Sequence, residues 1–443
     1  MFMHNPAIPY EGDCIKFLGR GPTVMPFEFT GWRDETLSWK DSAYLGAVLN
    51  PAPTYKITGP DTLKFLSDTN VNSFKNFPVG MGKHGIMCTE EGIIMIDGVI
   101  IRTAEDEVIT YWMAPYISYV LEKGKYNAAG EDLTGKVFLF QIGGPRSLEI
   151  LENASGNDLH DIKFIHHRLS RIAGNEVRIL RLGMAGTLAY EVHGNIDDAY
   201  DVYKAIWSAG KEYGMKKLGQ LAYMMNHTED GFPQAYYHFP YPWYEDPGFA
   251  EYLDKSGGSL FGTNIAYAGS TGPDAKLRYR NPVELGWAPM IVFDHEFTGR
   301  KALEKMVANP KRQMVTLEWN TEDIVDVYAS QFRDEEPYQN MDRPNDCYYE
   351  LTFTYHADQV LKDGKLVGIS SGRAITQYYH KMISLCSIDV KYGATGTEVI
   401  VLWGDPGTRQ KEIRAKVARF PYLNENRNQV VDVNKIPRLT TNK

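Results

Sequence analysis

The feature that most constrains the fold is an alternation of apolar and polar residues over positions 311–443, interrupted by glycine-containing turns. Two of these turns contain Gly364 and Gly396, and a strand pattern over residues 384–401 follows the first turn and includes the second. Alternation places apolar side chains on one face of a strand, and glycine allows the turns that end it. Residues 311–443 are therefore predicted to form an all-β unit, with a loosely held polar tail from Asn424.

The preceding residues predict a mixture of helices and strands, after an extended N-terminal arm over residues 1–30. A first group follows a short helix at 34–43 and contains a helix that Asp61 caps. A second group contains an amphipathic helix at 197–213. The predicted strands are 55–58, 92–103, 107–112, 136–142, 177–182 and 188–192.

These patterns predict three units: residues 1–135, residues 136–310 and residues 311–443. The second unit contains residues 232–282, which are aromatic and poorly periodic. A long stretch without periodicity is more typical of a segment that covers a site than of a core element. The two α+β units have a similar order of elements, but no repeated sequence connects them.

Composition narrows the class of protein. The chain has 43% hydrophobic and 23% charged residues, which is typical of a soluble globular protein. Its formal net charge of −9, without basic clusters, argues against nucleic acid as a partner. The most apolar stretch, residues 92–101, contains Asp97, so no membrane-spanning helix is expected. No secretory signal is visible, and a cytoplasmic location is expected.

Cysteine and histidine residues do not indicate a metal site. The four cysteines, Cys14, Cys88, Cys347 and Cys386, lack the C-x-x-C spacing of zinc ligands and are expected to be reduced thiols. His166 and His167 are adjacent on a predicted strand and would point to opposite faces. No metal is therefore expected.

Three motifs identify a family resemblance. They are the run DGKLVGISSGR at 363–373 with the turn GTEV at 396–399, the run HEFTGRKAL at 295–303, and the segment from Gly183 to Glu191. Together they resemble, in order, the motifs of the glycine-cleavage T-protein family, over most of residues 55–422. The resemblance implies an α+β chain with two ferredoxin-like units and a C-terminal β-barrel around a central folate channel. It also implies tetrahydrofolate as the cofactor.

The resemblance assigns several residues to folate. Glu191 matches the glutamate that reads the pterin edge, where a carboxylate accepts hydrogen bonds from a row of N–H groups. Phe164 and Gln141 match a ring-stacking aromatic residue and an amide, and Phe232 matches a second aromatic position. Asp97 matches the first acid of the family's aspartate pair, and orienting folate or ending a strand are both open roles for it.

The position of Tyr223 suggests a branch of the family. Glu229 and Gly231 align with a family run in which His227 replaces an arginine, and this alignment puts Tyr223 where the T-protein has another arginine. Tetrahydrofolate-dependent aryl O-demethylases carry a tyrosine there. A phenol has a pKa of roughly 10, close to that of an aryl leaving group, so Tyr223 is the expected general acid.

The expected donor is a neutral aromatic compound. Gly98 replaces the second acid of the aspartate pair, which disfavours aminomethyl chemistry. Benzoate-specific demethylases carry a histidine-rich stretch and an arginine where this chain has residues around Pro51 and Met113. A buried carboxylate without a cation would be costly. Tyr236 and Trp243 of the insertion are expected to form a lid or wall for the ring, unless the insertion is a packing arm between domains.

The sequence thus predicts an O-demethylase that moves a methyl group from an aryl methyl ether to tetrahydrofolate and releases a phenol. One alternative is cleavage of a methylenedioxy ring to give methylenetetrahydrofolate. Another is demethylation of a sulfonium or a methylated amine, for which the aromatic insertion would supply a cage. A non-enzymatic alternative is a folate-binding sensor or assembly factor. The sequence indicates no oligomeric state.

Overall fold

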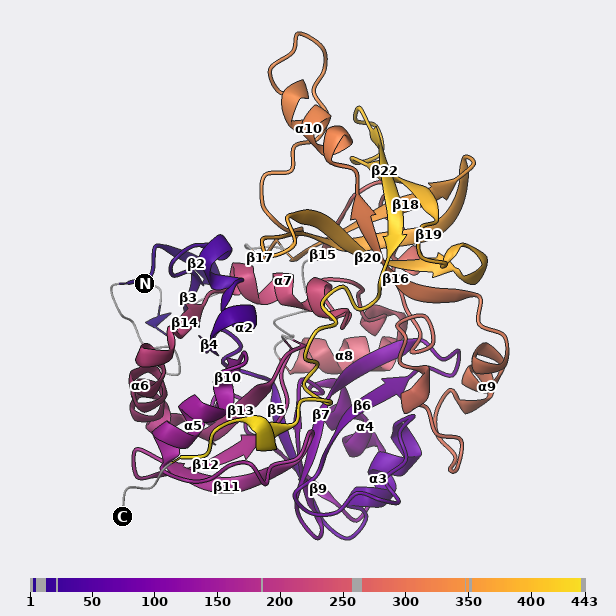
Figure 1. The fold of residues 1–443 in the computed structure, drawn as a ribbon. Coiled ribbons are helices and arrows are strands. Elements are labelled where there is room, and N and C mark those ends of the chain that lie inside the picture. The colour runs from indigo at the N-terminus through magenta and orange to yellow at the C-terminus, as the bar shows by residue number, and fades with distance from the viewer. Residues whose placement is uncertain are drawn as a thin grey trace.

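The computed structural model of the chain describes residues 3–4, 13–20, 23–184, 186–256, 265–346, 348–349 and 353–439. Ala185, Cys347, positions 257–264 of the insertion and parts of the N-terminal arm lie outside these ranges. Figure 1 shows three β-sheet units around the central helix α7 (Gln220–Asp230). Among the described residues, no helix is long and apolar enough to cross a membrane.

The first large sheet is antiparallel, with the strand order β6-β7-β8-β5-β9. Its longest strand pairs with β8 as the sequence predicts, with Ile101 opposite Ile109. Asp61 precedes α3 as predicted, but its carboxylate accepts a hydrogen bond from Asn127 N (2.7 Å) and does not cap the helix. The elements of this unit are β5 (Thr54–Thr58), α3 (Thr62–Thr69), β6 (Gly82–Cys88), β7 (Ile94–Ala104), β8 (Glu107–Tyr111), α4 (Tyr116–Lys123) and β9 (Ala129–Asp132).

The second large sheet has the order β11-β12-β13-β10-β4-β14. Strand β4 comes from before the first sheet in the chain, yet it pairs with β10 and, in parallel, with β14. Helices α5 and α6 contact each other and pack beside β11. The elements are β4 (Tyr44–Gly46), β10 (Val137–Gly143), α5 (Ser147–Ser155), β11 (His167–Ile172), β12 (Asn175–Leu180), β13 (Ala189–Asn195), α6 (Ala199–Gly210) and β14 (Lys216–Leu218).

The C-terminal sheet closes into a six-stranded barrel. Its strands follow the order β18-β19-β20-β16-β22-β21, and the pair Val360 and Val401 joins β21 back to β18. The barrel strands are β16 (Arg312–Trp319), β18 (Phe353–Lys362), β19 (Lys365–Thr376), β20 (Lys381–Asp389), β21 (Glu398–Trp403) and β22 (Lys411–Ala418). Two short strands, β15 (Ile265–Ala268) and β17 (Tyr348–Tyr349), also pair with β18. The predicted α+β fold with a C-terminal barrel is confirmed.

Three local predictions were wrong. The N-terminal arm contains the strands β1 (Met3–His4), β2 (Lys16–Arg20) and β3 (Thr23–Glu28), which form a small sheet. The single helix predicted at 34–43 is two short helices, α1 (Trp32–Glu35) and α2 (Ser38–Asp41). The predicted all-β unit also contains the helix α10 (Thr321–Ser330), which Asn320 caps by accepting from Asp323 N (3.1 Å). In each case the missed elements are short, so the sequence pattern did not resolve them.

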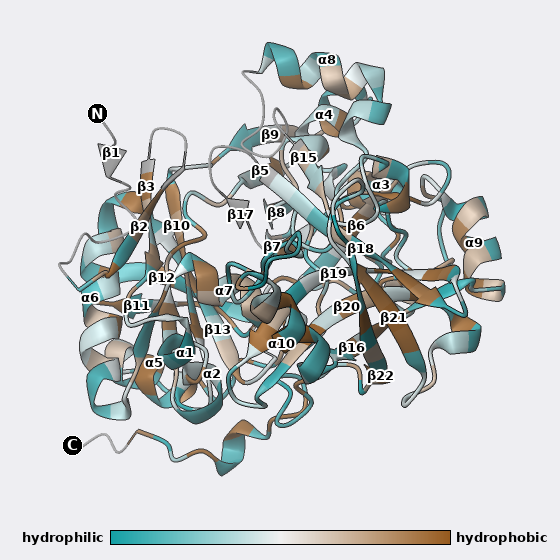
Figure 2. Cartoon of the chain, turned by 90° about the horizontal axis from the view of Figure 1, so that it is seen from above, coloured by the Kyte–Doolittle hydropathy of each residue, from teal (hydrophilic) through white to brown (hydrophobic). Residues whose placement is uncertain are grey.

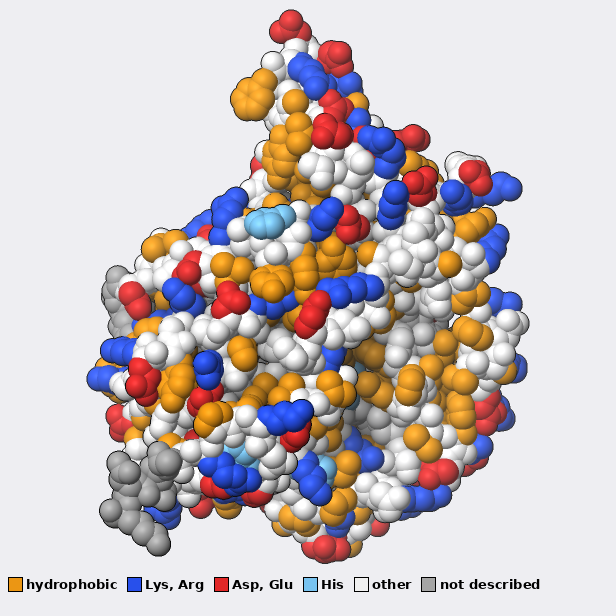
Figure 3. Space-filling model, in the orientation of Figure 1, with side chains coloured by type: hydrophobic (Ala, Val, Ile, Leu, Met, Phe, Trp, Pro, Cys, Tyr) orange, Lys and Arg blue, Asp and Glu red, His pale blue; other side chains and the backbone are white. Residues whose placement is uncertain are grey.

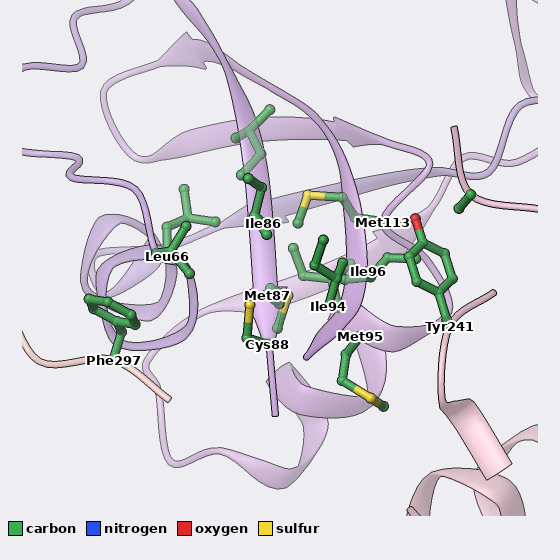
Figure 4. Close-up of a cluster of buried hydrophobic side chains, with 14 of the residues drawn as sticks. Leu66, Ile86, Met87, Cys88, Ile94, Met95, Ile96, Met113, Tyr241 and Phe297 are labelled. Carbon is green, nitrogen blue, oxygen red and sulfur yellow. The ribbon is translucent and has the colours of Figure 1, made fainter. Parts of the chain in front are cut away.

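The insertion packs into the core of the first unit. Figure 4 shows Tyr241 beside Ile96 and Met113, and all three belong to the same buried cluster as Leu66 and Cys88. Trp243 donates a hydrogen bond to Met95 O (2.6 Å), which fixes the insertion to β7. The insertion also contains α8 (Pro247–Lys255), which contacts α4, and α9 (Arg300–Ala308) follows it. The insertion is therefore a packing arm of the first unit.

The surface has no extended region of one charge on the face drawn in Figure 3, where basic and acidic side chains are intermixed. Helix α10 projects from the barrel in Figure 1, and Phe332 just after it is 91% exposed. Figure 2 shows hydrophobic residues gathered on the strands, with hydrophilic residues on the outer turns of helices such as α6 and α8. This distribution is what burial of apolar surface in the hydrophobic cores produces.

Candidate functional site

A cavity of about 480 Å³ lies where the two α+β units, helix α7, the insertion and the C-terminal segment meet. Strands β7 and β8 of the first sheet and β10 and β13 of the second sheet contribute to its wall. Eight residues that the sequence analysis assigned to the site line this cavity: Asp97, Gln141, Phe164, Glu191, Tyr223, Phe232, Tyr236 and Trp243.

Glu191 is an almost fully buried carboxylate in the cavity wall. It lies on β13 directly opposite Gln141 of β10, and its Oε1 accepts a hydrogen bond from Gln141 Nε2 (3.2 Å). Its Oε2 lies 3.1 Å from His193 Nε2, on the same strand and the same face. Two neighbours therefore orient the carboxylate before any ligand binds. Gln141 Oε1 is buried without a hydrogen-bond partner in the described part of the chain, so it can accept from a ligand.

Tyr223 and His227 form a second polar group, one turn apart on α7. The hydroxyl of Tyr223 lies 3.2 Å from His227 Nε2, and His227 Nδ1 lies 3.2 Å from the carbonyl oxygen of Phe232. Burial raises the pKa of Tyr223 well above 10, and the nearby Tyr44 and Glu191 raise it further. Burial lowers the pKa of His227 to about 4. Both groups are therefore neutral near pH 7.

Asp97 lies at the end of the cavity formed by the first sheet. Its Oδ1 accepts a hydrogen bond from the Tyr241 hydroxyl (2.6 Å), and its Oδ2 lies 2.8 Å from His84 Nε2. His84 is held in turn between aromatic rings, with centroid distances of 5.2 Å to Phe232 and 4.8 Å to Trp287. The carboxylate is thus fixed in position, and Asp97 lies within β7 and not at its end.

Aromatic side chains form most of the remaining wall. Tyr241 and Trp243 stack with a centroid distance of 5.5 Å, and Tyr236 meets both rings edge-on. Tyr236 adopts a backbone φ of 67°, a conformation that costs energy for a residue with a side chain. Flat rings arranged in this way suit an aromatic ligand.

The polar C-terminal segment, residues 423–439, is part of the site. The prediction of a loosely held tail was wrong. Arg427, Asn428 and Gln429 line the cavity, and Arg427 forms an ion pair with the buried Asp230 of α7. Arg181 donates from Nη2 to the carbonyl oxygens of Asn428 (2.7 Å) and Val431 (3.0 Å). Hydrogen bonds to buried groups hold the segment, and Leu423 and Val433 also pack into the hydrophobic cores.

Two residues assigned to the substrate do not line the cavity. Met113 is fully buried, and its side chain packs below Gly98 in the core of the first unit. Pro51 lies outside the wall, whereas Pro53 contributes to it. Trp112 and Ala114, on either side of the buried Met113, line the cavity, and the chain turns here after the end of β8 with Trp112 at a φ of 70°.

Sequence reasoning missed several residues of the wall, among them His84 and Tyr111. His84 reaches Asp97 because β6 and β7 pair with Ile86 opposite Asp97, which makes His84 a diagonal neighbour. The ring of Tyr111 contacts the tilted ring of His193 at a centroid distance of 4.4 Å, which brings the two sheets together at this point. Strand register across two sheets determines these contacts, and the sequence gives no direct signal for it.

Comparison with known proteins supplies the family. A model of the GCVT N-terminal domain family matches residues 25–237. Sesamin methylene transferase from Sinomonas sp. (strain No.22) is 48% identical over 423 residues, which are 94% of this chain and 94% of that protein. Syringate O-demethylase from Sphingobium sp. (strain NBRC 103272 / SYK-6) is 33% identical over 441 residues, covering 93% and 94%.

The fold agrees with these similarities. The crystal structure of the glycine cleavage system aminomethyltransferase T from Bartonella henselae superposes with a TM-score of 0.69 at 16% identity, covering 94% of this chain and 96% of that chain. At this identity the likeness shows the fold alone. Since the similarity to two relatives extends over almost the whole length, the chain belongs to the GCVT family of tetrahydrofolate-dependent one-carbon transferases.

Proposed function

We propose that the protein transfers a one-carbon unit from a neutral aromatic ether to tetrahydrofolate and releases a phenol. The observation that carries this proposal is the composition of one cavity. A buried carboxylate (Glu191), a buried phenol (Tyr223) and an aromatic wall from the insertion face the same space. This set can hold a flat heterocycle at one end and an aromatic ring at the other.

The residues of the cavity fit tetrahydrofolate. Glu191 would accept hydrogen bonds from the pterin N–H groups, and the unpaired Gln141 Oε1 offers a further acceptor. Phe164 and Phe232 supply apolar surface for the ring. Tetrahydrofolate itself provides the nitrogen that accepts the carbon, so the protein contributes binding, orientation and control of the proton.

The charges of the wall favour a neutral donor. Among the described residues that line the cavity, Arg427 alone carries a permanently positive side chain, and it is paired with Asp230. A donor carboxylate would thus enter a buried site that contains Glu191 and Asp97 without a free cation. Desolvating such an anion is costly. This argument supports an uncharged methoxy or methylenedioxy compound over a benzoate.

Transfer of a methylene unit is the first candidate, and transfer of a methyl group is the second. The relative named for methylene transfer shares 48% of its residues with this chain, against 33% for the relative named for demethylation of syringate. Cleavage of a methylenedioxy ring releases two phenol oxygens and therefore needs two protons, whereas a methyl ether needs one. The cavity wall contains two separate hydrogen-bonded groups, Tyr223 with His227 and Asp97 with Tyr241 and His84.

The test is mass spectrometry of the folate product after the protein is incubated with tetrahydrofolate and a pool of neutral and acidic aryl ethers. Methylenetetrahydrofolate together with a catechol supports the first candidate, and methyltetrahydrofolate with a phenol supports the second. A preference for acidic donors would contradict the proposal that the donor is neutral. If no donor yields a one-carbon folate, the proposed function is wrong.

A further inference from the structure

The hydrogen bond between Tyr223 and His227 has a defined direction. The carbonyl oxygen of Phe232 can only accept, so His227 Nδ1, 3.2 Å away, carries the hydrogen. A neutral imidazole has one N–H group, which leaves Nε2 as an acceptor. The Tyr223 hydroxyl, 3.2 Å from Nε2, therefore donates to His227 and presents its oxygen lone pairs elsewhere.

This direction conflicts with Tyr223 acting alone as a general acid. In the resting site its proton points to His227. Burial also makes the phenol a weaker acid than an ordinary phenol leaving group, because its pKa is raised well above 10. An isolated Tyr223 would not readily give its proton to an aryl oxygen. A partner that takes up and returns the proton resolves the conflict.

We infer that His227 is a positioning residue that receives the proton of Tyr223 and returns it, so that the pair relays a proton across the cavity. This inference rests on the proposed function. The attacking amine must lose one proton for each C–O bond that breaks. Tyr223 Oη accepts that proton while its own proton moves to His227 Nε2. The C–O bond breaks with its electron pair on the aryl oxygen, and the proton of His227 returns through Tyr223 to that oxygen.

The surroundings of His227 suit this role. The imidazolium formed in the relay keeps its Nδ1–H bond to the Phe232 carbonyl, and the negative charge of Asp97 favours it. His227 is 2% exposed, so its proton does not exchange freely with solvent during the step. Burial lowers its pKa to about 4, so the imidazolium is a strong acid and returns its proton readily. Tyr223 and His227 therefore have the same protonation at the end of a catalytic cycle as at its start.

Two substitutions separate the two bonds of His227. The amide of His227→Asn reaches the position of Nδ1, so it keeps the bond to Phe232 and loses the acceptor for Tyr223. The amide of His227→Gln reaches the position of Nε2 and keeps an acceptor for Tyr223. The kcat of His227→Asn is expected to fall about 10-fold or more with the KM for tetrahydrofolate changed less than 3-fold. His227→Gln, which accepts but does not carry a proton, should hold Tyr223 in place and recover part of this loss.

A double-mutant cycle and nuclear magnetic resonance complete the test. In a Tyr223→Phe background, His227→Asn should change kcat less than about 2-fold, because both residues act in one step. In the folded protein without ligand, ¹⁵N-histidine spectra should show the Nδ1–H tautomer of His227, with an Nε2 shift that changes in Tyr223→Phe. The inference would be overturned if the effects of the two substitutions on kcat multiplied in the double mutant. It would also be overturned if the spectra showed the Nε2–H tautomer of His227. Wild-type activity in Tyr223→Phe would instead remove Tyr223 from the chemistry, and an inactive wild type would remove the proposed function.

Discussion

At the scale of single residues, the site depends on buried polar groups whose partners are already in place. Glu191 is held by Gln141 and His193, and Asp97 is held by Tyr241 and His84. A buried carboxylate that is oriented by donors loses less entropy on binding than one that must first find its position. The free oxygen lone pairs of these groups are therefore available to a ligand at low cost.

The first prediction concerns Glu191. Replacing Glu191 by Gln removes a charge-assisted acceptor, and hydrogen bonds to charged groups contribute about 1.5–3 kcal/mol. The affinity for tetrahydrofolate should fall about 10-fold to 100-fold, measured by calorimetric titration. Glu176→Gln, at an exposed position of the neighbouring strand β12, is the matched control and should bind normally. Equal affinity in the two variants would remove Glu191 from the folate site.

At the scale of elements, the barrel contains a buried ion pair on β18. His356 Nε2 lies 2.9 Å from Asp358 Oδ2, and the His356 ring stacks on Trp403 with a centroid distance of 4.7 Å. Asp358 Oδ1 accepts a hydrogen bond from Ser270 N (3.0 Å), which ties the insertion to the barrel. Burial lowers the pKa of His356, but Asp358 and Asp346 raise it more, to about 9.

The second prediction follows from the sign of that shift. The pKa of His356 is higher in the folded protein than its ordinary value near 6.5, so its stabilisation is complete below pH 6.5 and is lost as the pH rises through 9. The loss is on the order of 3 kcal/mol, since each pKa unit corresponds to about 1.4 kcal/mol. The melting temperature of the wild type should fall more between pH 6.5 and 9.5 than that of His356→Gln. His380→Gln, at an exposed position, should behave like the wild type. If the melting temperatures of the wild type and His356→Gln changed equally with pH, the ion pair between His356 and Asp358 would not stabilise the fold.

The third prediction concerns Arg181, which connects β12 to the C-terminal segment. Its buried guanidinium donates to Asn428 and Val431, and Arg181→Gln would leave the two carbonyl oxygens without their charged donor. Unsatisfied buried groups cost about 1–3 kcal/mol each. Arg181→Gln should lower both the melting temperature and the affinity for tetrahydrofolate, as measured by thermal denaturation and titration. Arg171→Gln, exposed on β11, should change neither.

At the scale of the whole molecule, the cavity exists because three parts of the chain meet. The first sheet supplies Asp97, the second sheet supplies Glu191, and the C-terminal segment crosses from the barrel to supply Arg427 (Figure 1). Among the residues that the structure describes, no barrel strand contributes to the wall. Its role is to hold α7, which contacts β19 and β20, and to return the chain to the site.

The fourth prediction tests the C-terminal segment as a unit. A chain that ends at Leu423 lacks Arg427 and leaves Asp230 buried without its cation, which costs about 3–5 kcal/mol. This chain should melt at a lower temperature and bind tetrahydrofolate weakly. A chain that lacks only residues 440–443, beyond the described part, is the control. If the long truncation binds folate normally, the segment does not complete the site.

The fifth prediction concerns stabilisation by the ligand. A ligand that contacts both sheets and α7 binds only the folded protein, and at 100 times its Kd it stabilises by about 2.7 kcal/mol. Tetrahydrofolate should therefore raise the melting temperature by a few degrees in the wild type. At the same ligand concentration the increase should be smaller in Glu191→Gln. An increase of the same size in that variant would place folate elsewhere.

The sequence was a good guide where function depends on residue type within one element. The period of two predicted β7, β8, β10 and the barrel strands, and the family motifs pointed to Glu191 and Tyr223. The sequence was a poor guide to which side chains of a segment line the cavity. Met113 lies between the wall residues Trp112 and Ala114 but is buried in the core, Pro51 lies outside the wall, and His227 was noted only as a replacement for an arginine. The polarity of the C-terminal segment did not indicate that its residues form hydrogen bonds and an ion pair with buried residues.

By itself, the sequence determined the family, the α+β class with its barrel, and the folate cofactor, because local periodicity and short motifs are encoded in consecutive residues. Only the tertiary structure decided how Asp97 meets His84, how Tyr223 meets the one acceptor of His227, and how Arg427 closes the cavity. These contacts depend on the register of the strands, on the position of α7 and on the path of the C-terminal segment from the barrel to the cavity. Their geometry follows from the packing of the whole chain, which no local pattern specifies.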